Sequence, residues 1–155
     1  MAIQKVGVVG CGLMGSGIAQ VCAAAGFPTV VREVSAELVD KGLKGIEKNL
    51  NRLVEKGTIT GAARSEIRAR LNGTTSLEDL KNSDLIVEAI IEQLPAKREL
   101  FSALDKICAP SAVFASNTSS LTITEIATVT KRPQRFVGLH FFNPVPVMKI
   151  GRAHV

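Results

Sequence analysis

Three glycines near the N-terminus have the spacing of a phosphate-binding turn. Gly10, Gly12 and Gly15 form the pattern GxGxxG directly after the apolar run Val6–Val9 and before residues typical of a helix. Such a turn lets the backbone approach a pyrophosphate and points free helix N–H groups at it. Glu33 follows at the end of a second apolar run, where a carboxylate can accept hydrogen bonds from the hydroxyls of an adenosine ribose. Together these residues predict a dinucleotide site, whereas the glycines alone would predict only a tight turn.

The charges at the end of the second run bear on which dinucleotide binds. Glu33 would repel a 2′-phosphate, so the sequence favours NAD over NADP. The neighbouring Arg32 keeps NADP open as the alternative. The other residues of the turn are also expected to contact the cofactor, and these are Cys11, Leu13 and Met14.

Apolar runs and helical periodicities alternate along the rest of the chain. Strands are predicted at 6–9, 29–31, 84–91, 112–116 and 135–141. Helices are predicted at 18–25, 35–56, about 62–71, 96–107 and from Ser119 or Thr122 to about 129. This alternation indicates an α/β fold of Rossmann type, with a doubly wound, mostly parallel sheet and a helical-hairpin insertion after the second strand.

Composition limits the class of protein further. The 155 residues suffice for one domain, and 46% apolar with 21% charged residues is typical of a soluble globular protein without a membrane span. A net charge of +5 permits an anionic partner, but the absence of Trp and Tyr argues against nucleic acid. Three cysteines without a CxxC pair predict neither disulfides nor a metal site, and they favour a cytoplasmic setting.

Four segments carry a more specific resemblance. They are Gly10–Gln20, Val87–Glu92, Ser116–Leu121 and His140–Lys149. Together they resemble the NAD-binding domain of the L-3-hydroxyacyl-CoA dehydrogenases, including the 3-hydroxybutyryl-CoA enzymes, and the resemblance covers residues 3 to about 150. It implies an enzyme that oxidises the 3-hydroxyl of an acyl-CoA to a ketone while NAD takes the hydride, or that runs in reverse.

The resemblance also implies catalytic residues. His140 would act as the general base, a role that suits an imidazole at the carboxyl end of a predicted parallel strand. Ser119 would hydrogen-bond the substrate oxygen and the nicotinamide side, although its hydroxyl could also cap a helix. Asn143 would help to hold cofactor and substrate, although it could simply form a turn before Pro144.

Two further pairs of residues match binding positions of the family. Glu92 and Lys97 would contact the nicotinamide half of NAD, whereas the residue pattern alone predicts exposed side chains at both positions. Lys56 and Asn49, together with Ser119, would approach the CoA of the substrate. The alternative for this lysine-rich helix is a solvated face with local ion pairs, on which Lys56 only caps the last carbonyls.

The end of the sequence departs from the family. Arg152 stands where the family carries the glutamate that orients the histidine, and residues 151–155 bear no resemblance to it. We therefore expect residues 1–150 to form the NAD-binding domain and residues 151–155 to be an artificial rather than a natural tail. The helical C-terminal domain, through which the family forms homodimers, would be absent. Such a chain should bind NAD but turn over poorly.

Two other functions stay open at this point. The chain could be a non-catalytic dinucleotide-binding module that senses NAD or pairs with a separate helical partner. It could also belong to a related dehydrogenase that acts on hydroxy acids without CoA, although Ser116–Ser120 and His140–Met148 argue against this.

Overall fold

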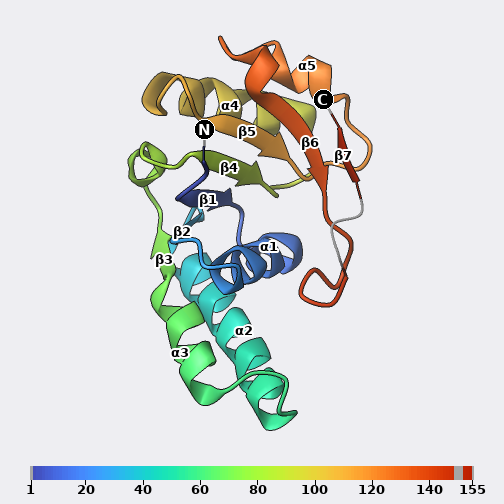
Figure 1. Cartoon of the computed structure of the whole chain (residues 1–155). Helices are drawn as coiled ribbons and strands as arrows, with labels where there is room; N and C mark the ends of the chain where they lie inside the picture. The colour runs from blue at the N-terminus through green and yellow to red at the C-terminus, as the bar shows by residue number, and fades with distance from the viewer. Residues whose placement is uncertain (1, 149–151, 155) are drawn as a thin grey trace.

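A seven-stranded sheet lies at the centre of the molecule (Figure 1). The structure is a computed structural model that describes residues 2–148 and 152–154. Its strands run in the order β3-β2-β1-β4-β5-β6-β7. Their bounds are Val6–Val9 (β1), Thr29–Arg32 (β2), Leu71–Thr74 (β3), Leu85–Glu88 (β4), Val113–Ser116 (β5), Phe136–His140 (β6) and Arg152–His154 (β7). The first six strands pair in parallel, and β7 pairs antiparallel with β6. The order of β1 to β6 is that of a Rossmann fold.

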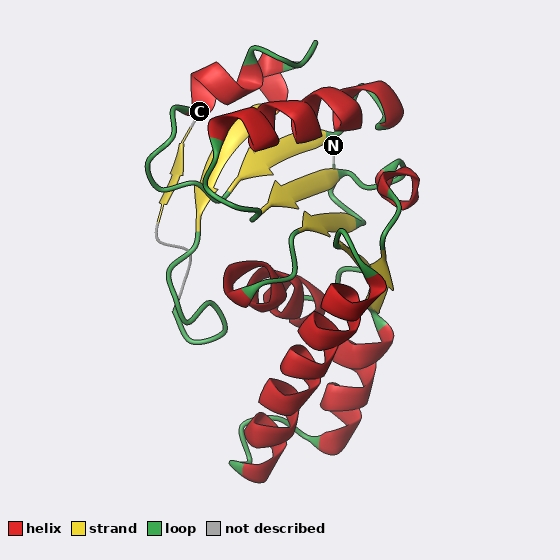
Figure 2. Ribbon diagram, turned by 180° about the vertical axis from the view of Figure 1, so that it is seen from behind, coloured by secondary structure: helices red, strands yellow, loops and turns green. Residues whose placement is uncertain are grey.

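Helices cover both faces of this sheet (Figures 1 and 2). They are α1 (Leu13–Ala24), α2 (Ala36–Glu55), α3 (Gly61–Ala69), α4 (Leu94–Ile107) and α5 (Ile123–Ala127). Helices α4 and α5 lie on one face and α1 on the other, while α2 and α3 form a hairpin that projects beyond the sheet. Within the described residues, no helix is both long and apolar enough to cross a membrane.

Two apolar layers hold the sheet between these helices. On the α1 side, Val8 and Ile18 belong to a buried cluster that continues to Ile46 on α2. On the other side, the ring of Phe101 on α4 packs edge-on against Phe136 of β6, with ring centroids 4.5 Å apart. Both faces of the central strands are therefore buried, which is why these strands read as continuous apolar runs in the sequence.

The predicted α/β fold, the mostly parallel sheet and the helical hairpin after β2 are confirmed. Several predicted boundaries are wrong. Helix α1 begins at Leu13 rather than at 18, because Gly12 is its N-cap and the glycines of its first turns hide the apolar periodicity. Thr122 rather than Ser119 precedes α5, so Ser119 does not cap that helix. Strand β4 ends at Glu88, where the predicted strand continued to 91.

Two strands were not predicted. Strand β3 has the sequence LNGT, which lacks the apolar alternation of a strand, and it forms the edge beside β2. Strand β7 pairs with β6, where Arg152 lies opposite His140 and Ala153 lies opposite Leu139 in the register. The domain boundary expected at residue 150 lies outside the described residues.

Candidate active site

The glycine turn between β1 and α1 is formed by close backbone contacts. Gly10 has φ = +93°, and a Cβ atom there would lie 2.5 Å from the carbonyl oxygen of Ala89. A Cβ atom on Gly15 would lie 1.8 Å from the carbonyl oxygen of Gly10. Both positions therefore require glycine for the fold itself, because any side chain would displace the backbone.

Gly12 differs from the other two glycines of the motif. Apart from its own backbone and that of the adjoining residues, no described heavy atom lies within 4 Å of the position that a Cβ atom would take there. The N-cap Gly12 provides no side-chain hydrogen bond to the first turn of α1, so the first N–H groups of the helix lack the acceptor that a capping side chain would supply. A pyrophosphate fits this arrangement, since it could approach the backbone at Gly12 and accept hydrogen bonds at the positive end of the helix.

Glu33 lies beside the turn, as the sequence predicted. The Cys11 backbone N–H donates to Glu33 Oε1 at 2.7 Å, and the Val34 N–H donates to Oε2 at 2.9 Å. The carboxylate is thus held at the turn and retains lone pairs for ribose hydroxyls. Arg32, the residue that favoured NADP, donates from Nε to the carbonyl oxygen of Thr75 at 3.2 Å.

The other residues of the turn face in different directions. The Cys11 thiol is buried against α2, where a Cβ atom on Gly42 would lie only 2.0 Å from its Sγ atom. Burial, and to a lesser extent the charge of Glu33, raise the pKa of Cys11 to about 11, so this thiol stays protonated and unreactive. Leu13 is exposed at the start of α1.

A cavity of about 370 Å³ opens next to the turn, where β4, β5 and β6 end. Crevices at the carboxyl ends of parallel strands are the usual ligand sites of such sheets. Six of the predicted site residues line it, and they are Met14, Glu92, Lys97, Ser119, His140 and Asn143. The structure therefore brings the predicted catalytic residues and the nicotinamide-side residues to one place.

His140 is the last residue of β6, and its surroundings restrict its ring. The imidazole is half-buried and packs edge-on against Phe142, with centroids 5.2 Å apart. The loop that follows is tied to the loop after β5, because the Phe141 N–H donates to Asn117 Oδ1 at 2.8 Å. Ser119 and Asn143 both lie on these two loops and are exposed, so their polar groups are free to meet a ligand.

Lys97 lies between two carboxylates at the wall of the cavity. Its Nζ atom is 2.5 Å from Glu88 Oε1 and 3.1 Å from Glu92 Oε2. The side chain of Lys97 is only 1% exposed, so the residue pattern was wrong in predicting a solvated lysine. Glu92 is 41% exposed, and there the prediction of an accessible side chain is confirmed.

Glu92 is held in its ionised form by its neighbours. Partial burial is the largest influence on its pKa and raises it, but hydrogen bonds from Thr118, Lys97 and Ser120 and the charge of Lys97 outweigh burial and lower the pKa below its usual value. The Ser120 hydroxyl donates to Glu92 Oε1 at 3.1 Å, and the Thr118 hydroxyl donates to the same oxygen. Glu92 therefore presents a carboxylate to the cavity at neutral pH.

Glu88, Ser116 and Thr118 were not among the predicted site residues. A sequence signal for Glu88 exists, because it is a charged residue inside the apolar run 85–91 and a buried charge requires a partner. Ser116 and Thr118 belong to the segment Ser116–Leu121, which carries part of the family resemblance, and this segment was the available signal for them.

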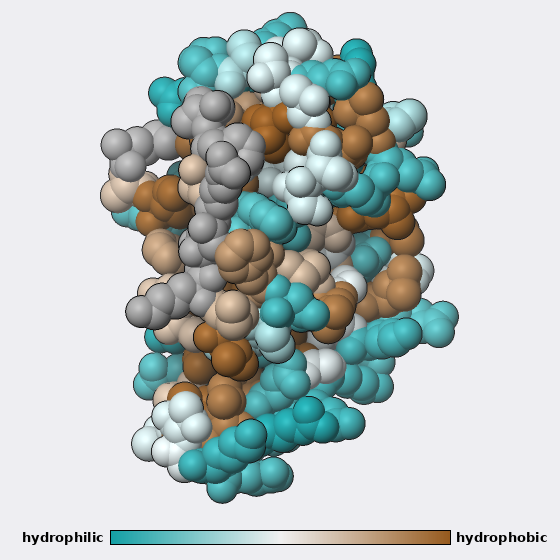
Figure 3. Space-filling view, turned by 90° about the vertical axis from the view of Figure 1, so that its right-hand side faces the viewer, coloured by the Kyte–Doolittle hydropathy of each residue, from teal (hydrophilic) through white to brown (hydrophobic). Residues whose placement is uncertain are grey.

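Lys56 and Asn49 do not line this cavity. Both side chains are exposed. Asn49 lies on α2, and Lys56 directly follows the helix, where its backbone N–H donates to the Arg52 carbonyl at 3.1 Å. Lys44 and Asp40 form an exposed ion pair of 2.6 Å on the same helix. Hydrophilic side chains cover much of the projecting hairpin (Figure 3), as a solvated helix face requires.

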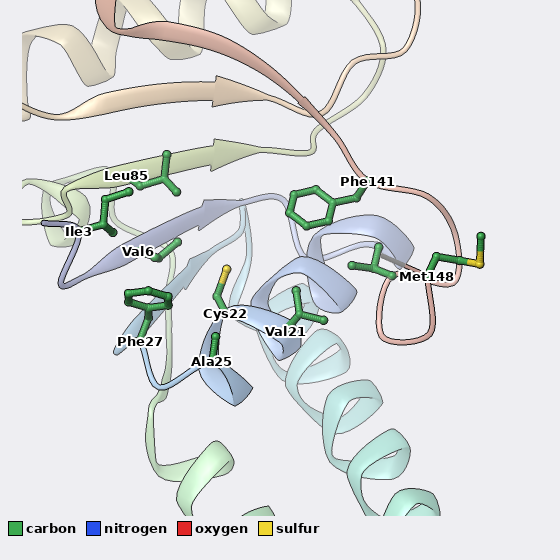
Figure 4. A pocket seen from close by; sticks show the side chains of 10 residues that line it. Ile3, Val6, Val21, Cys22, Ala25, Phe27, Leu85, Phe141 and Met148 are labelled. Carbon is green, nitrogen blue, oxygen red and sulfur yellow. The ribbon is translucent and has the colours of Figure 1, made fainter. Parts of the chain in front are cut away.

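A second cavity of about 570 Å³ lies beside α1 and has a different character (Figure 4). Its walls are apolar, with Val6, Phe27, Leu85 and Phe141 among them, and the Cys22 thiol points toward it. Burial raises the pKa of Cys22 to about 11. Although this cavity is larger, its described walls offer no group for acid–base chemistry, so the cavity at His140 is the candidate active site. No cluster of three or more metal-ligating side chains occurs in the described part of the chain.

Comparison with known proteins connects this geometry to a family. The sequence profile of the family described as "3-hydroxyacyl-CoA dehydrogenase, NAD binding domain" matches residues 5–150. The chain belongs to this family. The match confirms the predicted resemblance and NAD as the cofactor of the domain.

Individual relatives agree with the family match. A probable 3-hydroxybutyryl-CoA dehydrogenase of Bacillus subtilis is 49% identical over 150 residues, which are 97% of this chain and 52% of the relative. The mitochondrial hydroxyacyl-coenzyme A dehydrogenase of Rattus norvegicus is 47% identical over 154 residues, covering 96% of this chain and 49% of the relative. The chain thus spans about half the length of these relatives.

A solved structure has the same fold. The crystal structure of (S)-3-hydroxybutyryl-CoA dehydrogenase from Ralstonia eutropha superposes with a TM-score of 0.92 at 44% identity. The superposition covers 95% of this chain and 52% of that chain. The family match and the superposition therefore agree on the family and the fold of this chain.

The open space at Gly12 and the close contact at Gly15 predict different effects of the same substitution. Gly12→Ala should change the free energy of unfolding by less than about 1 kcal/mol, because no described atom is displaced. It should weaken NAD binding about tenfold or more, because the methyl group occupies the space that faces the pyrophosphate. Gly15→Ala should destabilise the fold by about 1–3 kcal/mol or more, since its methyl would meet a carbonyl oxygen. Urea unfolding and calorimetric titration measure both quantities, and undiminished NAD affinity in Gly12→Ala would place the pyrophosphate elsewhere.

Proposed function

We propose that this chain is the cofactor half of an NAD-dependent dehydrogenase that interconverts 3-hydroxyacyl-CoA and 3-ketoacyl-CoA. The observation that carries this proposal is the cavity at the carboxyl edge of the sheet, where His140 and the residues around Lys97 lie beside the glycine turn. The activities named for the relatives support an acyl-CoA as the substrate.

In this proposal separate side chains of the cavity carry out proton transfer, orientation of the substrate and binding of the cofactor. NAD, when bound, accepts a hydride from the carbon that carries the substrate hydroxyl. An imidazole nitrogen of His140 takes the hydroxyl proton, and the contact with Phe142 limits the directions in which the ring can turn. Ser119 orients the substrate oxygen and Asn143 holds cofactor and substrate, while Glu92 and Lys97 hold the nicotinamide half of NAD.

Other residues bind the adenosine diphosphate part of NAD and the CoA part of the substrate. The turn residues Gly10 to Gly15 and Glu33 hold the pyrophosphate and the adenosine ribose, and Glu33 selects NAD over NADP. Lys56 and Asn49 hold the CoA part of the substrate along α2, and their exposure supports this role.

We further propose that a helical second half completes the cavity and carries the contacts of a homodimer, and that residues 151–155 are an artificial tail. The register of β7 supports low activity of the chain by itself. Position 152 is the cross-strand partner of His140 in the register of β7 and β6. The resembling family carries a glutamate at this position, whose carboxylate would orient the imidazole, and this sequence has an arginine there instead. A chain that binds NAD without turnover is therefore the second candidate function.

The three cysteines of the chain are free, and the cytoplasmic setting that they favour stays a prediction.

The first prediction concerns the choice of cofactor. The chain should bind NAD at least about tenfold more tightly than NADP, because the Glu33 carboxylate repels a 2′-phosphate. Glu33→Gln keeps the shape of the side chain and should reduce this preference severalfold. Glu37→Gln, which removes an exposed charge from the first turn of α2, should leave the preference unchanged. Tighter binding of NADP than NAD by the unaltered chain would overturn the assignment of Glu33.

The second prediction tests the reaction. The chain by itself should reduce acetoacetyl-CoA with NADH at a small fraction of the rate of a chimera in which the second half of the Bacillus relative follows residue 150. In the chimera, His140→Gln should lower kcat by about 10²- to 10⁴-fold, the usual contribution of a positioned acid–base group. NADH absorbance measures these rates. Equal rates for the chain and the chimera would show that no second half is needed, and full activity of His140→Gln would remove its role as the base.

The third prediction concerns Lys56 in the same chimera. Lys56→Ala should raise KM for acetoacetyl-CoA about threefold to tenfold with little change in kcat, because an exposed lysine that pairs with a CoA phosphate contributes uniform binding. Lys106→Ala on α4 is the matched control and should leave KM unchanged. An unchanged KM in Lys56→Ala would remove this residue from the CoA site.

A further inference from the structure

The buried carboxylate of Glu88 is the least expected group at the cavity. It ends β4 with a fully buried side chain and accepts three hydrogen bonds. Its Oε1 atom accepts from the Ile90 backbone N–H at 2.7 Å and from Lys97 Nζ at 2.5 Å, and its Oε2 atom accepts from the Ser116 hydroxyl at 2.6 Å. Because all three neighbours act as donors, this environment suits an ionised carboxylate rather than a neutral acid.

Glu88 also determines how the charge of Lys97 is shared. The Lys97 ammonium contacts Glu88 and Glu92, and the shorter contact is the one to the buried Glu88. The positive charge of Lys97 is therefore shared between the two carboxylates, so Glu88, Glu92 and Lys97 together carry a net charge of −1. Thr118 and Ser120, which also donate to Glu92, are neutral and leave this excess in place.

The excess negative charge is directed at the cavity. Glu92 is the exposed member of the cluster and lines the cavity, whereas Glu88 is sealed behind Lys97. Among the described lining residues, the ionisable side chains are Glu92, Lys97 and His140. Their neighbours in the lining are apolar or carry neutral amide and hydroxyl groups, so no further cation from the lining cancels the charge of Glu92.

Such a charge distinguishes the two redox forms of a nicotinamide. The ring of NAD⁺ is a cation, and after it has accepted a hydride the ring of NADH is neutral. Both forms share the same adenosine, pyrophosphate and ribose groups, so contacts to those groups affect both affinities alike. A fixed negative charge beside the ring strengthens binding of the oxidised form only.

Resting on the proposed function, which places the nicotinamide in this cavity, we propose that Glu88 is a specificity-determining residue for the redox state of the cofactor. By occupying the Lys97 ammonium from its buried side, Glu88 leaves Glu92 incompletely neutralised, and the resulting charge favours NAD⁺ relative to NADH. Glu88 acts through Lys97 and Glu92 and has no contact with the cofactor in this role.

The experiment compares the dissociation constants of NAD⁺ and NADH for the 155-residue chain, measured by calorimetry and by NADH fluorescence. Glu88→Gln keeps the size of the side chain and leaves an amide oxygen for the Ile90 N–H and Lys97, while its NH2 group can donate to the Ser116 hydroxyl oxygen. The substitution changes the net charge of the cluster from −1 to 0. We expect the ratio Kd(NAD⁺)/Kd(NADH) to rise about tenfold, as for the loss of one charge near a partly hydrated ring. Glu99→Gln, which removes an exposed charge from the same helix as Lys97, is the matched control and should leave the ratio unchanged.

Two further variants separate charge from structure. Glu92→Gln also brings the cluster to a net charge of 0, and it should raise the ratio in the same direction while Glu88 and Lys97 stay paired. The double variant Glu88→Gln/Lys97→Met returns the net charge to −1 and should restore the original ratio to within about threefold. A merely structural role of Glu88 would weaken both nucleotides equally, and the double variant would not recover.

The outcomes distinguish this inference from the proposed function. If the unaltered chain bound neither nucleotide, the proposed function itself would fail. If it bound both, but Glu88→Gln and Glu92→Gln changed the ratio by less than twofold, the inference would be wrong while the cofactor domain stood. If Glu88→Gln does not fold, as thermal unfolding would reveal, the ratio for Glu92→Gln decides: a rise supports the inference and an unchanged ratio overturns it.

Discussion

The direct backbone contact between the glycine turn, α1 and the segment after β4 governs the whole functional edge of this domain. The Gly10 carbonyl lies where a side chain of Gly15 would be, and the Ala89 carbonyl lies where a side chain of Gly10 would be. With no side chain between them, the N-terminus of α1 is held directly above the neighbouring ends of β1 and β4. The position of the helix dipole, and with it the place of the pyrophosphate, thus follows from the absence of side chains at Gly10 and Gly15.

The other strands extend this edge through polar side chains at their carboxyl ends. Glu33 follows β2 and is held by the amide of the turn, and Glu88 ends β4 and joins Lys97 of α4 to Ser116 of β5. Asn117, directly after β5, accepts from the backbone that follows β6. The ends of β2, β4 and β5 are therefore each bonded to a neighbouring segment, so the cavity has walls whose groups are already oriented before a ligand arrives. The energetic benefit is preorganisation, because little ordering remains to be done on binding.

The fold was largely predictable from the sequence, and the site was predictable in part. Buried parallel strands appear as apolar runs, and the turn must contain glycine, so β1, α1 and Glu33 could be predicted from local rules. Strand β3 could not, because LNGT has no apolar pattern and forms a strand only through its pairing with β2. The residue pattern by itself predicted a solvated Lys97, since helical periodicity cannot reveal a carboxylate on another strand that pairs with it, whereas the family resemblance placed Lys97 at the cofactor. The roles proposed for Lys56 and Asn49 depend on contacts with a bound ligand, which neither helical periodicity nor the fold of the chain specifies.

The central place of β1 has a consequence for how the chain folds during synthesis. Strand β1 needs β2 on one side and β4 on the other, yet β4 begins only at Leu85. After β2 has been synthesised and before β4 follows, the hairpin of α2 and α3 can form from local contacts, whereas one edge of β1 stays unpaired. A nascent chain therefore exposes an apolar, hydrogen-bonding edge until about residue 88 has left the ribosome. Over that interval the partly folded chain would be most prone to aggregation and most dependent on chaperones.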